Sequence, residues 1–432
     1  MLFAGRARSM ALSVLAATAC GGESPAPAPE RIVLVVVDTL RADFVSPYSP
    51  KARTPHIQSL ADRGQVFERA YGSYHQTTMS MAALFTGRVP SLETGPMDQS
   101  LEWTGKTWCG MRRFATPPKD EACVPKELPA LAGSLREAGY WTVGVVTNTL
   151  LFQPLGFERG FDEWIEVGWL NASRTEPGYQ ANLPAARSAK NANSMVAKIL
   201  DQRPTDHFFL YVHFMEAHDY AATGSPYSAG VRRSDRAVGE LLAILKQRGL
   251  LDGATVFLVS DHGERLSESH FTKGGPLHYG NPSFEEVLHV PLVVSPGLPG
   301  RDTEALLRSD DIHRLILETA GIEPEDPGDL EDGELFVSEQ WFQTYRKGRF
   351  KSYRRRGEER VSLVDLEADP RETQDVADRY PEVAKAHEQR MRELSEHLRT
   401  ERSVPSSLSE EDARRLEALG YLKPTRPSPI AP

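Results

Sequence analysis

The sequence predicts an α/β fold with a doubly wound, mostly parallel sheet and a small antiparallel sheet plus helix near the C-terminus. Three observations support this prediction. Continuous runs of β-branched and aromatic residues, typical of strands covered on both faces, recur between positions 32 and 294. Segments with helical periodicity separate these runs, as parallel strands require. After Gly321 the pattern changes to short strands followed by a long helix.

The expected elements follow in chain order. Strands of the main sheet are expected at 32–37, 142–146, 208–214, 255–259 and 291–294, with helices at 54–63, 78–85, 128–138, 193–200 and 234–248. Further strands are expected at 334–339, 349–354 and 360–366, followed by a helix at about 380–400. A last helix is expected to begin at Ser409, a suitable N-cap with acidic residues in the next turn, and to end at Gly420.

The chain begins with a segment that resembles an export signal. Residues 1–20 combine two early arginines with a short apolar stretch that ends in small residues before Cys20. The residues around Cys20 resemble a bacterial lipoprotein processing site, so we expect export and a lipid anchor in the cell envelope, facing the periplasm or the outer surface. Plain secretion and a misassigned start are the alternatives. A Pro/Ala tether at 21–30 then leads into the main domain.

The remaining divisions follow from changes in pattern. The main catalytic domain is expected at 31–322, a small α+β subdomain at 323–404, and a helix with a tail at 405–432. Cys109 and Cys123 lie in an irregular insert, where a disulfide would close a loop of about 15 residues and contribute about 3 kcal/mol. Two unpaired thiols are the alternative. The formal net charge of −10 argues against a nucleic-acid partner, which requires a basic face.

Acidic residues directly follow two of the expected strands. Asp38 comes after the first strand, and Asp261 comes after the fourth, within Ser-Asp-His-Gly-Glu at 260–264. Open α/β sheets place their ligand crevice at this edge. Two aspartates and His262 suit one divalent cation, and the imidazole favours zinc or manganese over calcium or magnesium. A helix cap or a turn is the competing interpretation of each aspartate taken alone.

A third motif, HQTTMSMAALFTGR at 75–88, resembles the sulfatase signature. In that signature a Cys or Ser, followed by x-Pro-Ser-Arg, opens a helix that ends in Leu-x-Thr-Gly-Arg. Ser80 and the run at 83–88 set the register, which places Thr77 at the nucleophile position. The resemblance extends to DTLRAD at 38–43, FFLYVHFMEAH at 208–218, SDHGE at 260–264 and LEALGYL at 416–422. The chain is therefore similar to the sulfatase family of the alkaline phosphatase superfamily.

The departures from the signature bear on the chemistry. Thr77 cannot become formylglycine, and Met79 and Met81 replace the Pro and Arg that guide this conversion. Thr39 stands where many sulfatases have a second Asp, and His262 stands where arylsulfatases have Asn. The resulting set is similar to relatives with an unmodified Thr, such as phosphoethanolamine transferases, lipoteichoic acid synthases and nucleotide phosphodiesterases.

The resemblance implies a metal-dependent hydrolase in which Thr77 attacks a phosphate ester, and less so a sulfate ester. Asp38, Asp261, His262 and Thr77 would hold one divalent ion. A phosphothreonine can be hydrolysed by in-line attack of water, whereas a sulfated threonine lacks the second hydroxyl through which a formylglycine hydrate eliminates sulfate. A simple helix N-cap is the competing interpretation of Thr77.

Further residues receive roles only from the resemblance. His218 falls on a position that contacts substrate or protonates the leaving group, whereas His213 is expected to be structural. Weaker candidates for substrate binding are Arg41, Lys273 and His278.

Several functions stay open at this point. The substrate would be a small-molecule, lipid or glycan ester, and the membrane would be reached only through the lipid anchor. Alternatives to phosphate-ester hydrolysis are true sulfatase activity, transfer of a phospho-headgroup, and a non-catalytic sulfatase-like binding protein.

Overall fold

The structure, a computed structural model, describes residues 28–89, 124, 128–153, 155–167, 188–202, 205–221, 223–272, 283–325, 330–339, 342–355 and 357–397. The expectations for the export signal, Cys20, Cys109, Cys123, Lys273, His278 and the helix from Ser409 lie outside these ranges. Within the described part of the chain, no helix is both long and apolar enough to cross a bilayer.

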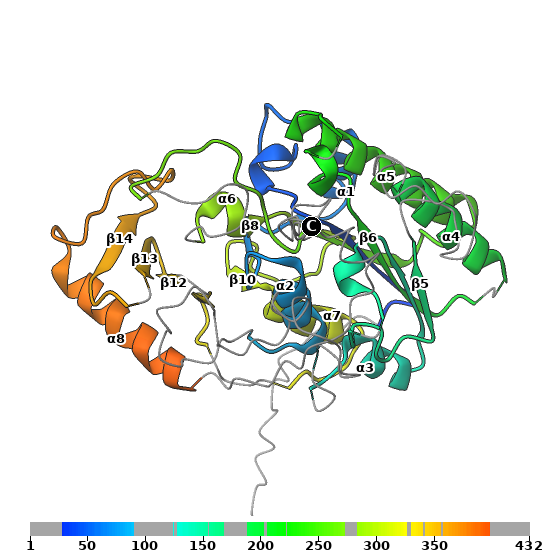
Figure 1. Ribbon diagram of the computed structural model, residues 1–432. Coiled ribbons are helices and arrows are strands. Elements are labelled where there is room, and N and C mark those ends of the chain that lie inside the picture. The colour runs from blue at the N-terminus through cyan, green and yellow to red at the C-terminus, as the bar shows by residue number, and fades with distance from the viewer. Residues whose placement is uncertain are drawn as a thin grey trace, which may run out of the picture.

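A seven-stranded sheet forms the centre of the main domain, in the order β2-β9-β7-β1-β6-β4-β5. Two of its strands, β5 and β6, are labelled in Figure 1. Its five parallel strands are β1 (Arg31–Val37), β4 (Trp141–Val146), β5 (Glu163–Glu166), β6 (Phe208–Phe214) and β7 (Ala254–Val259). The strands β2 (Gln65–Val66) and β9 (Leu292–Ser295) add an antiparallel edge. The mostly parallel sheet expected from the sequence is confirmed.

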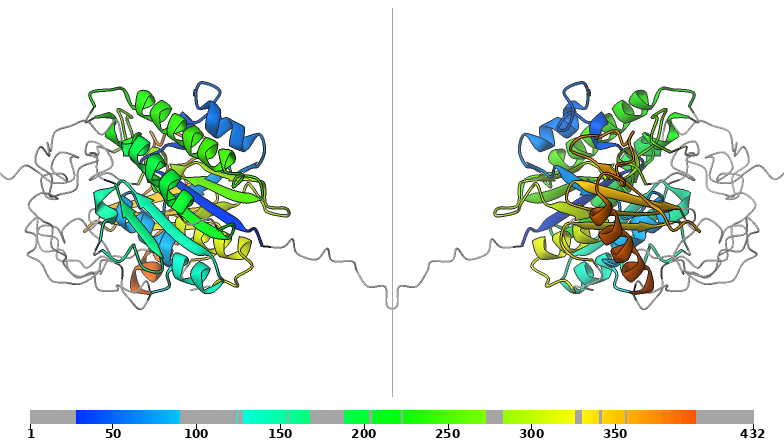
Figure 2. Two further views of the ribbon diagram at one scale, coloured as in Figure 1. Left: turned by 90° about the vertical axis from the view of Figure 1, so that its right-hand side faces the viewer. Right: turned by 90° about the vertical axis from the view of Figure 1, so that its left-hand side faces the viewer.

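Helices cover both faces of this sheet (Figure 2). On one face lie α1 (Pro55–Ala61), α4 (Ser188–Gln202) and α5 (Tyr227–Gln247), and on the other α2 (Thr77–Thr86), α3 (Leu131–Glu137) and α7 (Ser309–Thr319). Alternate side chains of β1 enter the two resulting cores: Ile32 and Leu34 pack with α2, α3 and α7, whereas Val33 and Val35 pack with α1, α4 and α5. Burial on both faces explains the unbroken apolar run of this strand.

The C-terminal subdomain is a four-stranded antiparallel sheet with one helix. Its strands are β11 (Glu334–Ser338), β12 (Phe342–Lys347), β13 (Phe350–Arg355) and β14 (Val361–Asp365), and α8 (Pro381–His397) packs on them (Figure 1). Lys351 of β13 is fully buried, with its ammonium 2.8 Å from Glu285 and 3.1 Å from Glu372. Because Glu285 belongs to the main domain, this buried ion pair joins the subdomain to it.

Short elements complete the fold. A second sheet contains β3 (Arg69–Tyr71), β8 (His289–Val290) and β10 (Leu306–Arg308), while η1 (Ala42–Phe44), η3 (Thr149–Leu151), η4 (His218–Tyr220) and α6 (Glu285–Leu288) are single turns.

The structure contains elements that the sequence reading omitted. Strand β12 was missed because its sequence, FQTYRK, is mostly polar, yet Gln343 and Arg346 are buried through hydrogen bonds. Helix α7 was missed because it begins with Ser-Asp-Asp; Asp311 accepts a hydrogen bond from the backbone N–H of Arg308 and so closes the first turn. Helix α5 begins at Tyr227 rather than at 234.

Candidate active site

Four strands of the main sheet deliver polar side chains to one edge. Asp38 directly follows β1, and Asp261 lies two residues after β7, which pairs with β1 in parallel. Asn148 lies two residues after β4, and His213 is the next-to-last residue of β6. Since parallel strands end at the same edge of a sheet, these residues meet there, as open α/β sheets place their ligands. All four side chains are almost completely buried.

Thr77 joins this edge from the first turn of α2. Its Oγ1 lies 3.3 Å from Asp38 Oδ2 and 3.3 Å from His262 Nε2, and His262 Nε2 lies 3.5 Å from Asp261 Oδ2. The structure therefore brings together the four side chains that the sequence singled out. The interpretation of Thr77 as a helix N-cap is wrong, because Gln76 occupies that position. Thr77 instead lies at the positive end of the helix dipole, where negative charge is stabilised.

The two oxygens of Asp38 have different surroundings. Oδ2 accepts hydrogen bonds from Asn148 Nδ2 at 2.7 Å and from His213 Nε2 at 3.0 Å. Oδ1 is buried and has no hydrogen-bond partner among the described residues. Burial alone would raise the pKa of Asp38, but the hydrogen bond from His213 and the positive charge of His218 hold it well below its usual value. Asp38 is thus an anion with one unused oxygen.

The loop after β7 presents a second unused oxygen. Asp261 Oδ1 accepts hydrogen bonds from the backbone N–H groups of Thr39 at 3.1 Å and His262 at 2.9 Å. Asp261 Oδ2 is buried and, within the described ranges, no hydrogen bond reaches it. Thr39, whose N–H donates to this carboxylate, has a φ of 55°, a left-handed conformation that is uncommon for a residue other than glycine. The Thr39 hydroxyl donates to the carbonyl oxygen of Asp38 at 2.8 Å.

The ring orientation of His262 makes its Nε2 a ligand atom. Its Nδ1 lies 2.8 Å from the carbonyl oxygen of Gly263, to which it must donate its hydrogen. In the neutral ring, Nε2 then carries a lone pair directed at Thr77 and Asp261. A second hydrogen bond of this kind commonly sets the tautomer of metal-binding histidines.

These atoms fit a divalent cation. Two buried carboxylate oxygens without hydrogen bonds in the described part of the chain, one from Asp38 and one from Asp261, would be costly without a positive partner. With His262 Nε2 and Thr77 Oγ1 they form a mixed oxygen and nitrogen donor set, which suits zinc or manganese better than calcium. The ligand atoms of Asp38, His213 and Asp261 also lie within 4.8 Å of one another.

The sequence reading missed two contacts of Asp38. His213 was expected to be structural, yet its ring contacts the carboxylate directly. Asn148 was overlooked, although its amide also lies 3.4 Å from Thr77 Oγ1. The rule that identified the two aspartates, a polar side chain just after a buried strand, also applies to Asn148 and would have found it.

Two further site residues predicted from the sequence, His218 and Arg41, are bonded to carboxylates outside the cluster around Asp38. His218 is buried in η4, with Nδ1 3.2 Å from Asp219 Oδ1. Burial would lower the pKa of His218, but the hydrogen bond to Asp219 and the negative charges of Asp38, Asp219 and Glu264 raise it to about 9. Arg41 bonds the carboxylates of Asp43 and Glu268 and the carbonyl of Glu264, so a substrate anion would compete with two carboxylates for its guanidinium.

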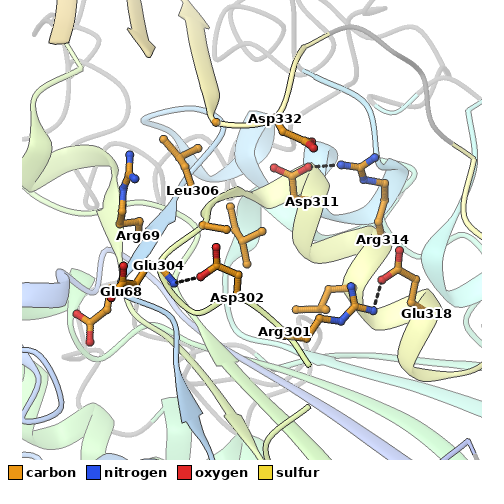
Figure 3. A pocket seen from close by; sticks show the side chains of 14 residues that line it. Glu68, Arg69, Arg301, Asp302, Glu304, Leu306, Asp311, Arg314, Glu318 and Asp332 are labelled. Atoms are coloured by element: carbon orange, nitrogen blue, oxygen red, sulfur yellow. Dashed lines mark hydrogen bonds and ion pairs between the residues drawn. The ribbon is translucent and has the colours of Figure 1, made fainter. Parts of the chain in front are cut away.

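A cavity of about 1090 Å³ lies elsewhere, between β3, β10 and α7 (Figure 3). Some of its charged side chains pair with one another: Arg314 bonds Asp311 at 2.6 Å, and Arg301 bonds Glu318. The residues that line it include none of the cluster around Asp38. The size of this cavity is therefore no guide to the chemistry of the chain.

Gly263 offers a test of how tightly the loop after β7 is held. A Cβ at this position would lie 2.1 Å from the carbonyl oxygen of Glu286, and the neighbouring Glu264 N–H bonds the same oxygen at 3.0 Å. We expect Gly263→Ala to displace His262, to weaken zinc binding at least about 10-fold and to cost about 1–3 kcal/mol of stability. Chelator competition and urea unfolding measure the two effects.

Gly133→Ala is the matched control for this loop test. Gly133 lies on α3, where the nearest atom to an added Cβ is 3.5 Å away. We expect no loss of stability, because alanine favours helices. Equal behaviour of the two variants would show that the loop is not held as the structure indicates.

A family model described as Sulfatase matches residues 30–322. The N-acetylgalactosamine-6-sulfatase of Canis lupus familiaris is 26% identical over 360 residues, which cover 72% of this chain and 66% of that protein. The arylsulfatase A of Bos taurus is 24% identical, over 68% of this chain and 65% of that protein. The chain thus matches slightly less than two thirds of the length of these relatives.

Solved structures agree in fold. The phosphonate monoester hydrolase of Agrobacterium radiobacter superposes with a TM-score of 0.60 at 17% identity, covering 86% of this chain and 96% of that chain. Ps i-CgsB, solved in complex with k-i-k-neocarrahexaose, has a TM-score of 0.61 at 19% identity and covers 92% of this chain and 98% of its own. With a family model that matches most of its length, the chain belongs to the sulfatase family, in the alkaline phosphatase superfamily.

Proposed function

We propose that the protein hydrolyses a phosphate ester by attack of the Thr77 hydroxyl, at a site that holds one divalent cation. The observation that carries this proposal is the position of Thr77 Oγ1, 3.3 Å from both Asp38 Oδ2 and His262 Nε2 and beside two unused carboxylate oxygens. A bound zinc or manganese ion would neutralise charge on the phosphoryl group and lower the pKa of the hydroxyl.

The chain's own residues supply the remaining steps. With a cation bound, the Thr77 hydroxyl would lose its proton to solvent; Thr77 Oγ1 then forms a bond to phosphorus, and the bond from phosphorus to the leaving oxygen breaks. His218 donates a proton to that oxygen. Water then attacks the phosphothreonine; a proton of this water passes to the departing Thr77 oxygen and restores the hydroxyl, and inorganic phosphate is released. His218 regains its proton from solvent. The positive end of the α2 dipole lies next to the developing negative charge.

Phosphate is favoured over sulfate because a threonine has one hydroxyl. A formylglycine hydrate can release sulfate by elimination through its second hydroxyl, whereas a sulfated threonine would require attack at sulfur. Sulfate-ester hydrolysis is the second candidate, and the names of the N-acetylgalactosamine-6-sulfatase and arylsulfatase relatives favour it. A structural neighbour named as a phosphonate monoester hydrolase is consistent with phosphorus chemistry in this fold.

The deciding experiment compares three esters: nitrophenyl phosphate, bis(nitrophenyl) phosphate and nitrophenyl sulfate. Each is incubated with the protein in the presence of zinc or manganese, and with Thr77→Ala as the matched blank. Turnover of a phosphate ester that disappears in Thr77→Ala supports the proposal. Faster turnover of the sulfate would overturn the preference for phosphate, and no turnover with a tightly held metal would indicate a binding protein. Release of nitrophenol only when an acceptor alcohol is present would indicate a transferase.

His218→Gln tests the role of the leaving-group acid. With a pKa raised to about 9, His218 stays protonated through neutral pH and loses its proton only as the pH rises through about 9. We expect the substitution to reduce kcat about 10²-fold or more for a methyl phosphate ester, whose leaving group needs a proton. For nitrophenyl phosphate, whose leaving group is stable as an anion, the reduction should be much smaller. Equal reductions for both esters would argue against this role.

We also propose that the protein is exported and anchored through Cys20, as the sequence pattern indicates. In bacteria that express the full chain, the wild type should sediment with membranes. Cys20→Ser should appear in the soluble periplasmic fraction. Membrane association of both proteins would contradict lipidation at Cys20.

A further inference from the structure

Tyr211 and His213 form a buried hydrogen-bonded chain that ends on Asp38. They lie two residues apart on β6, so their side chains share one face of the strand. Tyr211 OH lies 2.7 Å from His213 Nδ1, and His213 Nε2 lies 3.0 Å from Asp38 Oδ2. Both side chains are completely buried. A chain of polar groups at this depth needs each hydrogen in a defined place.

The positions of the hydrogen atoms in this hydrogen-bonded series can be deduced from the chemistry of its groups. An ionised carboxylate can only accept hydrogen bonds, so His213 Nε2 must carry a hydrogen to contact Asp38. In the neutral ring, Nδ1 is then an acceptor, and the Tyr211 hydroxyl donates to it. Burial, with the charges of Asp261 and Asp38, raises the pKa of Tyr211, so the phenol keeps its proton. His213 therefore has no lone pair to offer a cation on this side.

Asn148 makes the second donor contact to the same oxygen. Its Oδ1 accepts a hydrogen bond from the backbone N–H of Leu150 at 2.8 Å, which sets the orientation of the amide. Its Nδ2 must then be the atom 2.7 Å from Asp38 Oδ2. Thr147 also fixes β6 against β4, because its hydroxyl donates to the backbone carbonyl of His213 at 2.7 Å. Oδ2 thus has two nitrogen donors, whereas no described residue donates to Oδ1.

We propose that Tyr211, His213 and Asn148 are positioning residues that occupy Asp38 Oδ2, so that Asp38 presents Oδ1 alone to the cation. This inference rests on the proposed cation site and specifies how that site is built. It makes His262 the single imidazole ligand of the cation. By distance alone His213 would also qualify, because one of its ring nitrogens lies within 4.8 Å of carboxylate oxygens of Asp38 and Asp261. Partners of this kind hold a ligand in one orientation and reduce the cost of binding.

The first test counts imidazole ligands in the zinc-loaded full chain by X-ray absorption spectroscopy. We expect one imidazole in the wild type and one in His213→Gln, with the zinc affinity of the variant reduced about 10- to 100-fold. Two imidazoles in the wild type and one in His213→Gln would overturn the proposal, because His213 would then be a ligand. An unchanged affinity in His213→Gln would overturn it as well.

The second test removes only the hydroxyl at the far end of the chain. Tyr211→Phe should also weaken zinc binding, because His213 loses the partner that sets its tautomer, whereas the zinc-to-protein ratio at saturation stays at one. Tyr140→Phe is the matched control: its hydroxyl bonds the carbonyl of Pro29 at 2.6 Å, remote from Asp38, and its loss should leave affinity unchanged. Equal affinities of the two variants would contradict a positioning role for Tyr211.

Thermal unfolding in the presence of a chelator shows whether each variant folds without metal. Asn148→Ala provides an independent variant if His213→Gln fails to fold, and a reduced zinc affinity is again expected. All readouts are made without substrate. A protein that binds zinc through one imidazole but hydrolyses no ester would refute the proposed function and leave this inference standing. A protein that binds no zinc would refute the inference together with the cation site.

Discussion

Thr77→Ala is expected to reduce kcat/KM for an aryl phosphate at least about 10³-fold, since loss of a catalytic nucleophile removes the covalent route. The hydroxyl is the only part of this side chain that reaches both Asp38 Oδ2 and His262 Nε2, each at 3.3 Å. Its removal leaves the carboxylates and the imidazole in place. The variant should therefore still bind zinc but no longer hydrolyse the ester.

Thr77→Ser is the matched control, because it keeps the hydroxyl and loses only a methyl group. We expect this variant to retain activity within about 10-fold to 100-fold of the wild type, with some loss because serine is less restricted at χ1. Acid quenching during turnover, followed by mass spectrometry of the peptide that contains residue 77, should detect a phosphorylated threonine in the wild type. Activity of Thr77→Ala close to that of the wild type would exclude Thr77 as the nucleophile.

Asp261→Asn is expected to weaken zinc binding by more than about 100-fold, beyond the 10- to 100-fold typical of losing an outer partner, and to abolish turnover with it. The amide oxygen of Asn can still accept hydrogen bonds from the backbone N–H groups of Thr39 and His262. The amide nitrogen then occupies the position of Oδ2 and directs hydrogens toward the cation site. A donor at this point repels a cation, so the substitution removes a ligand while keeping the loop's hydrogen bonds.

Metal content after dialysis and activity after metal addition measure this effect. The wild type should lose activity on chelation and regain it with zinc or manganese, and its thermal unfolding temperature should rise when metal returns. Asp261→Asn should respond to neither treatment. Asp201→Asn is the control, because Asp201 forms an exposed ion pair with Arg248 far along α4 and should behave as the wild type. Full activity of chelated wild-type protein would contradict a metal-dependent reaction.

Five strands of the main sheet, β1, β4, β6, β7 and β9, were predictable because they are buried on both faces. A continuous apolar run such as that of β1, between segments with helical periodicity, is typical of a strand covered on both faces, and every residue of β1 is buried. The elements that were not predicted include two short strands of the main sheet, β2 and β5, and the three strands of the second sheet. They also include two polar sequences, β12 and α7, which are buried through specific partners, such as Arg346 with Glu285. Local patterns carry no information about such partners, since these lie far away in the chain.

Some residues of the candidate site could be predicted from the sequence and others could not. Asp38, Asp261, His262 and Thr77 could be selected because each follows a strand or begins a helix within a recognisable motif. Asn148 obeyed the same rule without a motif, and His213 lay inside an apolar strand, where a histidine is usually structural. Arg41 shows the reverse case: a cation in the motif has its guanidinium bonded by Asp43 and Glu268, which only the folded chain reveals.

The sequence alone predicted how the main strands and helices follow one another along the chain, the family resemblance, and the residues that reach one edge of the sheet, because these depend on local periodicity and motifs. The order of the strands within the sheet came only from the structure. Only the tertiary structure decided which oxygen of Asp38 and of Asp261 accepts hydrogen bonds and which oxygen remains for a cation. That choice depends on donors from β4, β6 and the turn after β1, segments separated by more than 60 residues, whose hydrogen bonds exist only when the parallel strands lie side by side.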